Sequence, residues 1–301
     1  MKINLPPQRN ARRGFSMLEL ITMIGMLSTL TVVAFPHFNW MIPRAHASKC
    51  MNNMRSLASA VISTAMSDDD GNYPAAGSFK WTDFSSGKVL YSERKGWISW
   101  GEAPGSTSKA GGAAIPFSSE NEGLLHYAIA HGAIWKKMNG DRSCYQCPAH
   151  TQAFKEKTGR EPGWSYVMNQ EFGYDSNNGS GPLPGWSGRS LSSDGVGNSS
   201  PDRRLLFAEI QGVDVEELGL KAKHDATGTE GDGVLQYSKN EVIGFNHNDG
   251  WDWVGHVAFA DGHVQTIKYP RSGQSLTDIT KSFCQGHEVR FSDKRHEDLS
   301  K

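Results

Sequence analysis

The stretch "RRGFSMLELITMIGML", residues 12–27, places one carboxylate, Glu19, in an apolar run that follows directly after two arginines. Between Gly14 and Pro43 the chain has no Lys or Arg, and Glu19 is its only acidic residue there. Residues 15–35 are long enough to cross a membrane as one helix, which takes about 20 residues. A buried charge in such a helix costs about 3 kcal/mol without a partner. The sequence therefore predicts a membrane-spanning helix in which Glu19 has a specific role.

The residues on either side of this run indicate its orientation. Residues 1–14 contain four basic residues and no acidic one, which favours a cytoplasmic N-terminus and an extracytoplasmic remainder. A cleaved secretory signal would have a shorter apolar core followed by small residues at a cleavage site. The segment "PHFNWMIPRA", residues 36–45, has no such site. An ordinary signal anchor is the alternative, but it gives no reason for Glu19.

The segment "RRGFSMLEL" resembles the processing signal of type IV prepilins and type II secretion pseudopilins. In that family a short basic leader ends in Gly, Phe usually follows, and Glu is the fifth mature residue. The resemblance implies that prepilin peptidase cleaves between Gly14 and Phe15, and that the new Phe15 amine is methylated. It also implies that Glu19 pairs with the Phe15 ammonium of a neighbouring subunit. Pro36 falls where these pilins often have a helix-bending proline.

Six shorter stretches resemble one pilin-like subgroup, and they occur in the same order as in that subgroup. They are "CMNNMRSLASAV", "DDDGNYP", "CYQCPAH", "SYVMNQ", "RLLFAEI" and "FADGHVQTI". One feature departs from the subgroup, in which a His stands closer to the Asp-Gly pair than His247 stands to Asp261. This difference indicates a longer loop here, and any role inferred for the His does not carry over.

The domain organisation expected from the sequence has four parts. They are a leader (1–14), the transmembrane half of a long helix (15–36), its head-packing half (37–66) and an extracytoplasmic head (67–301). In the second half of the helix, apolar residues recur every three to four positions, which predicts one buried stripe. This stripe comprises Met51, Met54, Leu57, Val61, Ile62 and Ala65. The run Asp68–Asn72 ends the pattern and offers a Gly and an Asn for the helix cap.

The head has the composition of a loop-rich domain, because it contains 31 of the 33 glycines. A capping box, Ser119-x-x-Glu122, predicts a helix over 120–138. Four runs predict strands, and they are Arg204–Ile210, Glu241–Phe245, Gly255–Ala260 and His263–Lys268. The last two runs predict a hairpin with a two-residue turn at Asp261-Gly262. The expected fold class is α+β. The resemblance implies a pilin-like lollipop, in which the long helix packs on a small antiparallel sheet with long loops.

The four cysteines, Cys50, Cys144, Cys147 and Cys284, all lie beyond the predicted membrane helix, in an oxidising compartment. Cys144-x-x-Cys147 lacks a second ligand pair at the spacing typical of zinc sites. The sequence therefore favours a structural disulfide that uses Cys144 or Cys147. Four cysteines allow three pairings, and the sequence does not choose among them.

Several polar and aromatic residues are candidates for a binding site in the head. Six His and Asp residues crowd into residues 247–263, which suggests a metal site, an acid/base pair or the turn of a hairpin. We favour the turn and expect no metal or other cofactor. Calcium at Asp249 and Asp252 or at 68–70 is the alternative, although neither group has the spacing of a known calcium loop. A sugar-stacking surface is a further hypothesis, built from Trp97, Trp100, Trp251 and Trp253.

Together these observations predict a structural filament subunit of a pilus or a secretion pseudopilus, and no enzyme. The expected partners are copies of itself or other pilin-like subunits, prepilin peptidase and the inner-membrane assembly platform. The near-neutral net charge of −1 gives no indication of nucleic-acid binding. The expected location is the inner membrane, with a periplasmic head, and later an extracytoplasmic filament. The rival hypothesis is a membrane-anchored periplasmic binding protein or enzyme that acts on polysaccharide.

Overall fold

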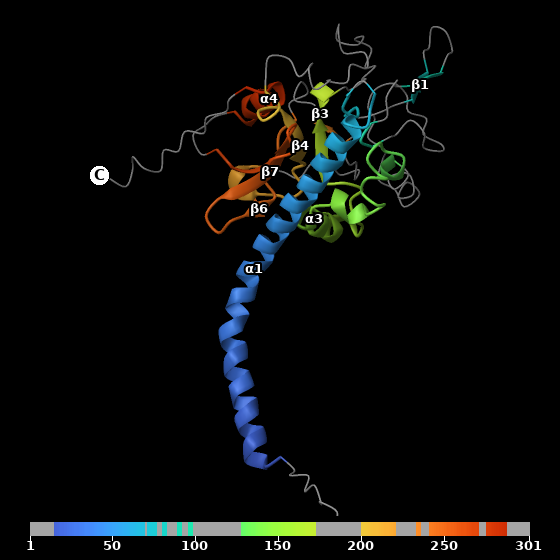
Figure 1. Ribbon diagram of the computed structural model, residues 1–301. Coiled ribbons are helices and arrows are strands. Elements are labelled where there is room, and N and C mark those ends of the chain that lie inside the picture. Colours follow the sequence, from blue (N-terminus) through green and yellow to red (C-terminus); the bar gives the residue numbers. More distant parts are fainter. Residues whose placement is uncertain are drawn as a thin grey trace, which may run out of the picture. The chain divides into compact units, whose positions relative to one another are not determined.

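The computed structural model describes ten ranges of the chain (Figure 1). In four of these ranges, it describes only the backbone of some or all residues. The ranges are 15–69, 71–76, 80–82, 89–91, 96–98, 128–172, 200–220, 233–235, 241–270 and 275–287, with the backbone alone at 33–40, 80–82, 89–91 and 217. The predicted leader, with Gly14, and the capping box at 119–122 lie outside these residues. The chain forms two compact units, Met1–Ile42 and Pro43–Lys301.

Helix α1, Met17–Ala65, runs without interruption through Pro36 and Pro43 and contributes to both units. Its first turn is closed by a reciprocal pair of hydrogen bonds. The Ser16 amide donates to Glu19 Oε2 at 2.9 Å, and the Glu19 amide donates to Ser16 Oγ at 3.2 Å. This is a capping box, in which each side chain satisfies a free amide at the helix start. Glu19 therefore caps its own helix, which the sequence analysis did not predict.

The first unit exposes large apolar side chains on every side of α1. Between Phe15 and Val32 eleven of them are at least half exposed. Within the described residues, no helix has both the length and the apolar character that crossing a membrane requires.

From Pro43 on, α1 belongs to the second unit, and it packs on the rest of that unit through the predicted stripe. Met54, Leu57 and Val61 are fully buried, and Ala65 is nearly so. Met51 and Ile62 lie at the edges of the stripe and are half-buried. The stripe also includes Cys50 and Ala58, both fully buried, so that Cys50 faces the core one turn before Met54.

The helix ends just before the acidic run Asp68–Asn72, as predicted. Its last residue is Ala65, and Asp68 Oδ2 accepts a hydrogen bond from the Asn72 amide at 3.0 Å. Gly71 adopts a positive φ of 66°, which a residue without Cβ does at little cost.

The main sheet has six strands in the order β5-β3-β4-β7-β6, with β8 paired to β7. Figure 1 labels β3, β4, β7 and β6 of this sheet. The strands are β3 (Tyr166–Asn169), β4 (Leu205–Glu209), β5 (Val234–Leu235), β6 (His247–Asn248), β7 (Trp253–Phe259) and β8 (Val264–Lys268). All pairs are antiparallel except β3 with β5, which is parallel. The α+β class is therefore confirmed, whereas the purely antiparallel sheet is wrong, because β5 joins its edge in the parallel direction.

Three of the four predicted strands form, as β4, β7 and β8. The fourth, Glu241–Phe245, is wrong. Its backbone amides bond outside a regular ladder: Ile243 donates to Thr280 Oγ1, Gly244 to the Glu209 carbonyl and Phe245 to Gln211 Oε1. The short strand β6 begins only after this segment.

The predicted hairpin is confirmed, and its loop is one residue longer than expected. The Phe259 amide donates to the His263 carbonyl at 2.9 Å, which leaves Ala260, Asp261 and Gly262 in the loop. Gly262 has φ +92°, which matches the three-residue hairpin loop that requires a positive φ at its last position.

The remaining elements surround the sheet. They are β1 (Lys80–Thr82) paired with β2 (Val89–Tyr91), the 3-10 helices η1 (Arg142–Tyr145), η2 (Gln170–Phe172) and η3 (Glu216–Leu218), and the helices α3 (Pro148–Thr158) and α4 (Leu276–Gln285). Of the helix predicted over 120–138, the described part is helical only at 128–130 and continues as turns to residue 140.

Two glycines allow the backbone before β6 to approach β7 closely. A Cβ on Gly255 would lie 2.0 Å from the Gly244 carbonyl oxygen, and one on Gly244 would lie 2.5 Å from the Ile210 backbone. Both contacts are with backbone atoms, which cannot move aside as a side chain can. This close approach places His247 and His256 near each other.

We therefore expect Gly255→Ala to lower the free energy of unfolding by about 2–3 kcal/mol. The matched control is Gly219→Ala, where a Cβ meets nothing within 4 Å but φ is +65°, so that only the strain of about 1 kcal/mol remains. Urea unfolding of the full chain measures both. Equal losses in the two variants would contradict the close-approach argument.

Candidate functional site

Neighbouring strands place a row of polar side chains on one face of the sheet. Tyr166 on β3 is paired in register with Glu209 on β4. The β4–β7 register pairs Ala208 with Val257, so the neighbouring Glu209 and His256 face the same side, because successive side chains alternate. His247 on β6 pairs with Val254 and joins the same face. Cys50 from α1 reaches this face, whereas Phe283 of α4 packs on Phe259, which points to the other side.

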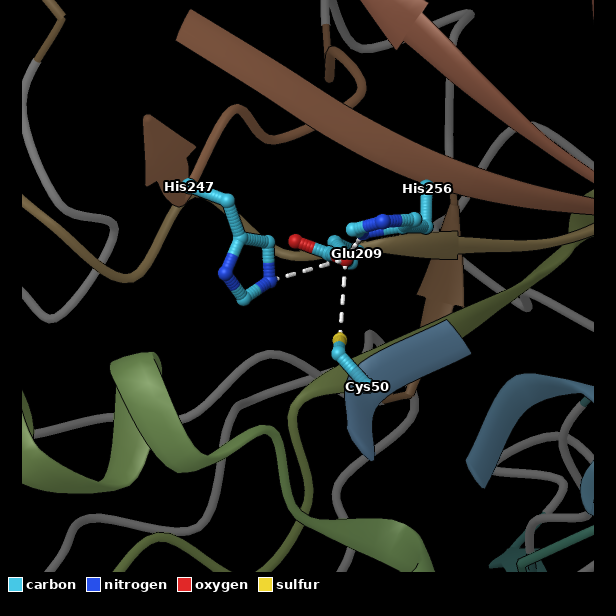
Figure 2. Close-up of side chains that lie close together, drawn as sticks. All are labelled: Cys50, Glu209, His247 and His256. Carbon is cyan, nitrogen blue, oxygen red and sulfur yellow. Dashed lines mark hydrogen bonds and ion pairs between the residues drawn. The ribbon is translucent and has the colours of Figure 1, made fainter. Parts of the chain in front are cut away.

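Glu209 lies at the centre of this group, and its Oε1 has three close neighbours (Figure 2). Cys50 Sγ donates to it at 2.9 Å, His256 Nδ1 lies at 2.6 Å and His247 Nε2 at 3.4 Å. These four residues each direct one ligand-type atom inward, and all four atoms lie within 4.8 Å of one another. We call these residues the buried cluster.

Two residues border the buried cluster. Cys147, the residue before α3, places its Sγ 3.4 Å from His247 Nε2. The Tyr166 hydroxyl lies 3.2 Å from Cys50 Sγ. Cys147, Tyr166, Cys50 and Glu209 are fully buried, as are His247 and His256 almost entirely. A substrate would reach these groups only if the surrounding elements moved, so the burial favours a structural role over catalysis.

Asn246 holds the other oxygen of the carboxylate. Its Nδ2 donates to Glu209 Oε2 at 2.9 Å and to the Ile210 carbonyl at 2.7 Å. Its Oδ1 accepts from the amides of Gly212 and Val213, at 2.7 and 3.2 Å. The side chain therefore fixes the position of Glu209 relative to the chain that follows β4.

The charges in the cluster depend on one another. Burial alone would raise the pKa of Glu209, but the two histidines hold it well below its usual range. Burial alone would lower the pKa of His247, but the Glu209 carboxylate raises it to about 10. Burial raises the pKa of the Cys50 thiol, and its interactions with Cys147 and Glu209 raise it further. The buried Glu209 carboxylate thus favours the protonated form of His247 and the neutral thiol of Cys50.

The predicted disulfide does not form, because all four cysteines are free thiols. Cys50 interacts with Glu209 and with Cys147, Cys147 also contacts His247, and Cys144 contacts Asp141 Oδ2, the last at 3.4 Å. Cys144 is half-buried, whereas Cys284 is fully buried in α4. The Cys-x-x-Cys spacing therefore places one thiol at the cluster and the other away from it.

Of the six His and Asp residues of 247–263, two lie in the cluster, two lie at the hairpin turn, and two lie in the loop between β6 and β7. His247 and His256 meet in the cluster, with ring centroids 4.9 Å apart. Asp261 Oδ1 accepts from the His263 amide at the hairpin turn, as the turn interpretation expects. That interpretation does not describe the two buried histidines, which contact Glu209 and not the turn.

The calcium candidates Asp249 and Asp252 serve the loop between β6 and β7. Asp249 Oδ1 accepts from the amides of Trp251 and Asp252, at 2.9 and 2.7 Å. Lys268 Nζ lies 3.0 Å from Asp252 Oδ2 and 3.7 Å from Asp249 Oδ2. An ammonium group thus occupies the position between the two carboxylates that a cation would need.

The sugar-stacking hypothesis is wrong for Trp97, one of its four tryptophans. Trp97 is fully buried, stacks on Tyr145 at 5.8 Å and meets Phe207 edge-on at 5.0 Å. It is therefore part of the core. Trp251 is 82% exposed, and Trp100 lies outside the described residues.

Sequence reasoning missed the central member of the cluster, Glu209. The signal was present, because Glu209 is the only charged residue within the apolar run "LLFAEI" of β4, and a charge in a buried strand needs a partner. Cys50 also carried a signal, because it lies one turn before Met54 on the apolar stripe. Which residue meets which could not be predicted, since Cys50 and Glu209 are 159 positions apart.

Comparisons with protein-family models, with curated protein sequences and with solved structures find no match to this chain. Its function is therefore argued from its own residues.

Proposed function

We propose that the chain is a structural subunit of a type IV pilus-like or type II secretion-like filament, made as a prepilin. The observation that carries the proposal is the first part of α1. It is a helix with exposed apolar side chains on all sides and one carboxylate, Glu19, in its first turn. A helix that is apolar all round needs a cover of lipid or of other helices.

In this proposal, lipid surrounds the apolar part of α1 before assembly, and helices of neighbouring subunits surround it in the filament. Before assembly, the apolar part of α1 lies in the inner membrane, with the N-terminus in the cytoplasm and the second unit in the periplasm. During assembly, it leaves the lipid and packs against the same segment of neighbouring subunits. The partners are thus copies of the chain or related subunits, together with prepilin peptidase and an assembly platform.

Glu19 has two roles in this proposal. It caps its own helix through Ser16, and it pairs with the Phe15 ammonium of a neighbouring subunit. The second role requires cleavage after Gly14, which creates that ammonium. A carboxylate among apolar helices is costly when it is alone, and a paired one is tolerated.

A membrane-anchored polysaccharide-binding protein remains the second candidate, because Trp251 is a large aromatic side chain exposed in the loop between β6 and β7. Exposed aromatic rings can stack on sugars, but one ring is a small platform. The two functions are compatible if the filament displays a binding unit.

The first test is the mature N-terminus. The chain isolated from membranes should begin at Phe15 and be heavier by one methylene unit than the unmodified form, because the new amine is methylated. Gly14→Trp should leave uncleaved precursor in the membrane, since a bulky residue would block the scissile bond. Intact-mass measurement checks both. A mature N-terminus within 36–50 would mean that signal peptidase had removed the anchor, and would exclude the filament role.

A further inference from the structure

We infer that the buried cluster is a binding site for a transition-metal ion of the Zn²⁺ class, held by Cys50, Glu209, His247 and His256 (Figure 2). This inference concerns the second unit alone and does not depend on filament assembly.

The separations of the donor atoms fit a four-coordinate site. Zinc bonds of about 2.0–2.3 Å in a tetrahedron place neighbouring ligand atoms about 3.3–3.6 Å apart. His247 Nε2 and Glu209 Oε1 are already 3.4 Å apart. Cys50 Sγ and His256 Nδ1 lie 2.9 and 2.6 Å from the same oxygen, and both distances would lengthen by roughly half to one ångström on binding.

The charges also balance. A divalent ion with the Cys50 thiolate and the Glu209 carboxylate gives a neutral centre, and both imidazoles then bind in their neutral form. The Glu209 carboxylate is fully buried, with its Oε1 against Cys50 and both histidines. His247 Nδ1 is also buried and has no hydrogen-bond partner among the described residues. A neutral centre avoids a net charge in these buried surroundings.

The types of donor atom select the class of ion. One sulfur, two imidazole nitrogens and one carboxylate oxygen suit zinc and its first-row neighbours, whereas calcium and magnesium take oxygen ligands. Cys147 borders the site without completing it. Its Sγ lies 3.4 Å from His247 Nε2 but is not among the four donor atoms that lie within 4.8 Å of one another, so we assign it as a neighbour of His247 and not as a ligand.

The ion would join parts of the chain that are far apart in sequence. Cys50 belongs to α1, and the other three ligands belong to β4, β6 and β7. A bound ion would therefore attach the helix to three strands of the sheet. It would also compete with oxidation, because a Cys50 thiolate bound to metal cannot form a disulfide with Cys147.

The experiment uses the full chain, purified in detergent without a metal-affinity step and supplied with Zn²⁺. Elemental analysis should find one zinc per chain. Cys50→Ser should bind zinc at least about 10–100-fold more weakly. The matched control, Cys144→Ser, removes a thiol outside the cluster and should retain the metal, as should Cys147→Ser. Cobalt added in place of zinc should give a thiolate charge-transfer band that Cys50→Ser abolishes.

A second measurement does not depend on variants that fold. A strong chelator should lower the midpoint of thermal unfolding of the wild-type chain, and added Zn²⁺ should restore it, because an ion that binds only the folded state stabilises it. Three results would each overturn the inference. They are no zinc and no chelator effect in the wild-type chain, metal loss in Cys147→Ser but not in Cys50→Ser, and a Cys50–Cys147 disulfide in non-reducing peptide maps of protein taken from cells.

Discussion

Replacing Glu19 with glutamine should leave the chain cleaved and in the membrane, but should largely abolish its entry into filaments. Glutamine can keep the reciprocal bonds of the capping box with Ser16, so the start of α1 remains intact. The charge is lost, however, and the Phe15 ammonium of a neighbouring subunit would be buried without a partner. We expect a cost of about 3–5 kcal/mol for each such pair. The measurement is the ratio of sheared filament to membrane subunit, variant against wild type.

Two further variants separate the cap from the charge. Ser16→Ala removes one half of the capping box and keeps the carboxylate, so it should cost only about 1 kcal/mol of helix stability and should assemble. Glu19→Val removes both the cap and the charge, and should fail to assemble. An unchanged filament ratio in Glu19→Gln would rule out the charge pair and favour the anchored binding protein. If Ser16→Ala were as deficient as Glu19→Gln, the cap alone would explain the importance of Glu19.

Features set by nearby residues could be predicted from the sequence. The buried stripe of α1, its end at 68–72 and the β7–β8 hairpin all depend on spacing within a few turns or strands. The same logic failed at Glu241–Phe245, where side chains elsewhere accept the backbone amides. It also failed for β5, which pairs in parallel with a strand more than 60 positions earlier. Pairings over such distances depend on the register of the folded chain, which local periodicity does not contain.

In the buried cluster, too, only the residues that are close in the sequence could be predicted to lie together. His247 and His256 stood out by their proximity in the sequence, but their partners come from α1 and β4. The close approach of Gly244 and Gly255 brings the two histidines together, and it involves glycines that had no visible role in the sequence. The motif Cys144-x-x-Cys147 misled for a related reason. Cys144 lies in η1 and contacts Asp141, whereas Cys147 is the buried residue just before α3.

Removing the Glu209 carboxylate should have the largest effect on the stability of the second unit. Glu209 is fully buried, and its two oxygens accept from Cys50 and Asn246 and lie against both histidines. Glu209→Ala leaves these groups without their common partner, and a protonated histidine without its counter-charge. Truncating one member of a buried charge pair typically costs about 3–5 kcal/mol. Urea unfolding of the full chain, followed by the fluorescence of the buried Trp97 and Trp164, measures the loss.

The matched control for Glu209→Ala is Glu161→Ala, which removes a carboxylate that lies 3.7 Å from Lys155 with both side chains about half exposed or more. Such a pair contributes only about 0–1 kcal/mol. Repeating the urea unfolding with Zn²⁺ and with a chelator separates two contributions of Glu209 to stability, the balance of the histidine charge and the binding of the ion. If it only balances the histidines, the loss is the same in both conditions. If it also binds the ion, the loss is larger with Zn²⁺, because the wild-type chain alone gains the binding free energy. A loss below about 1 kcal/mol in both conditions would mean that the carboxylate is not the centre of the cluster.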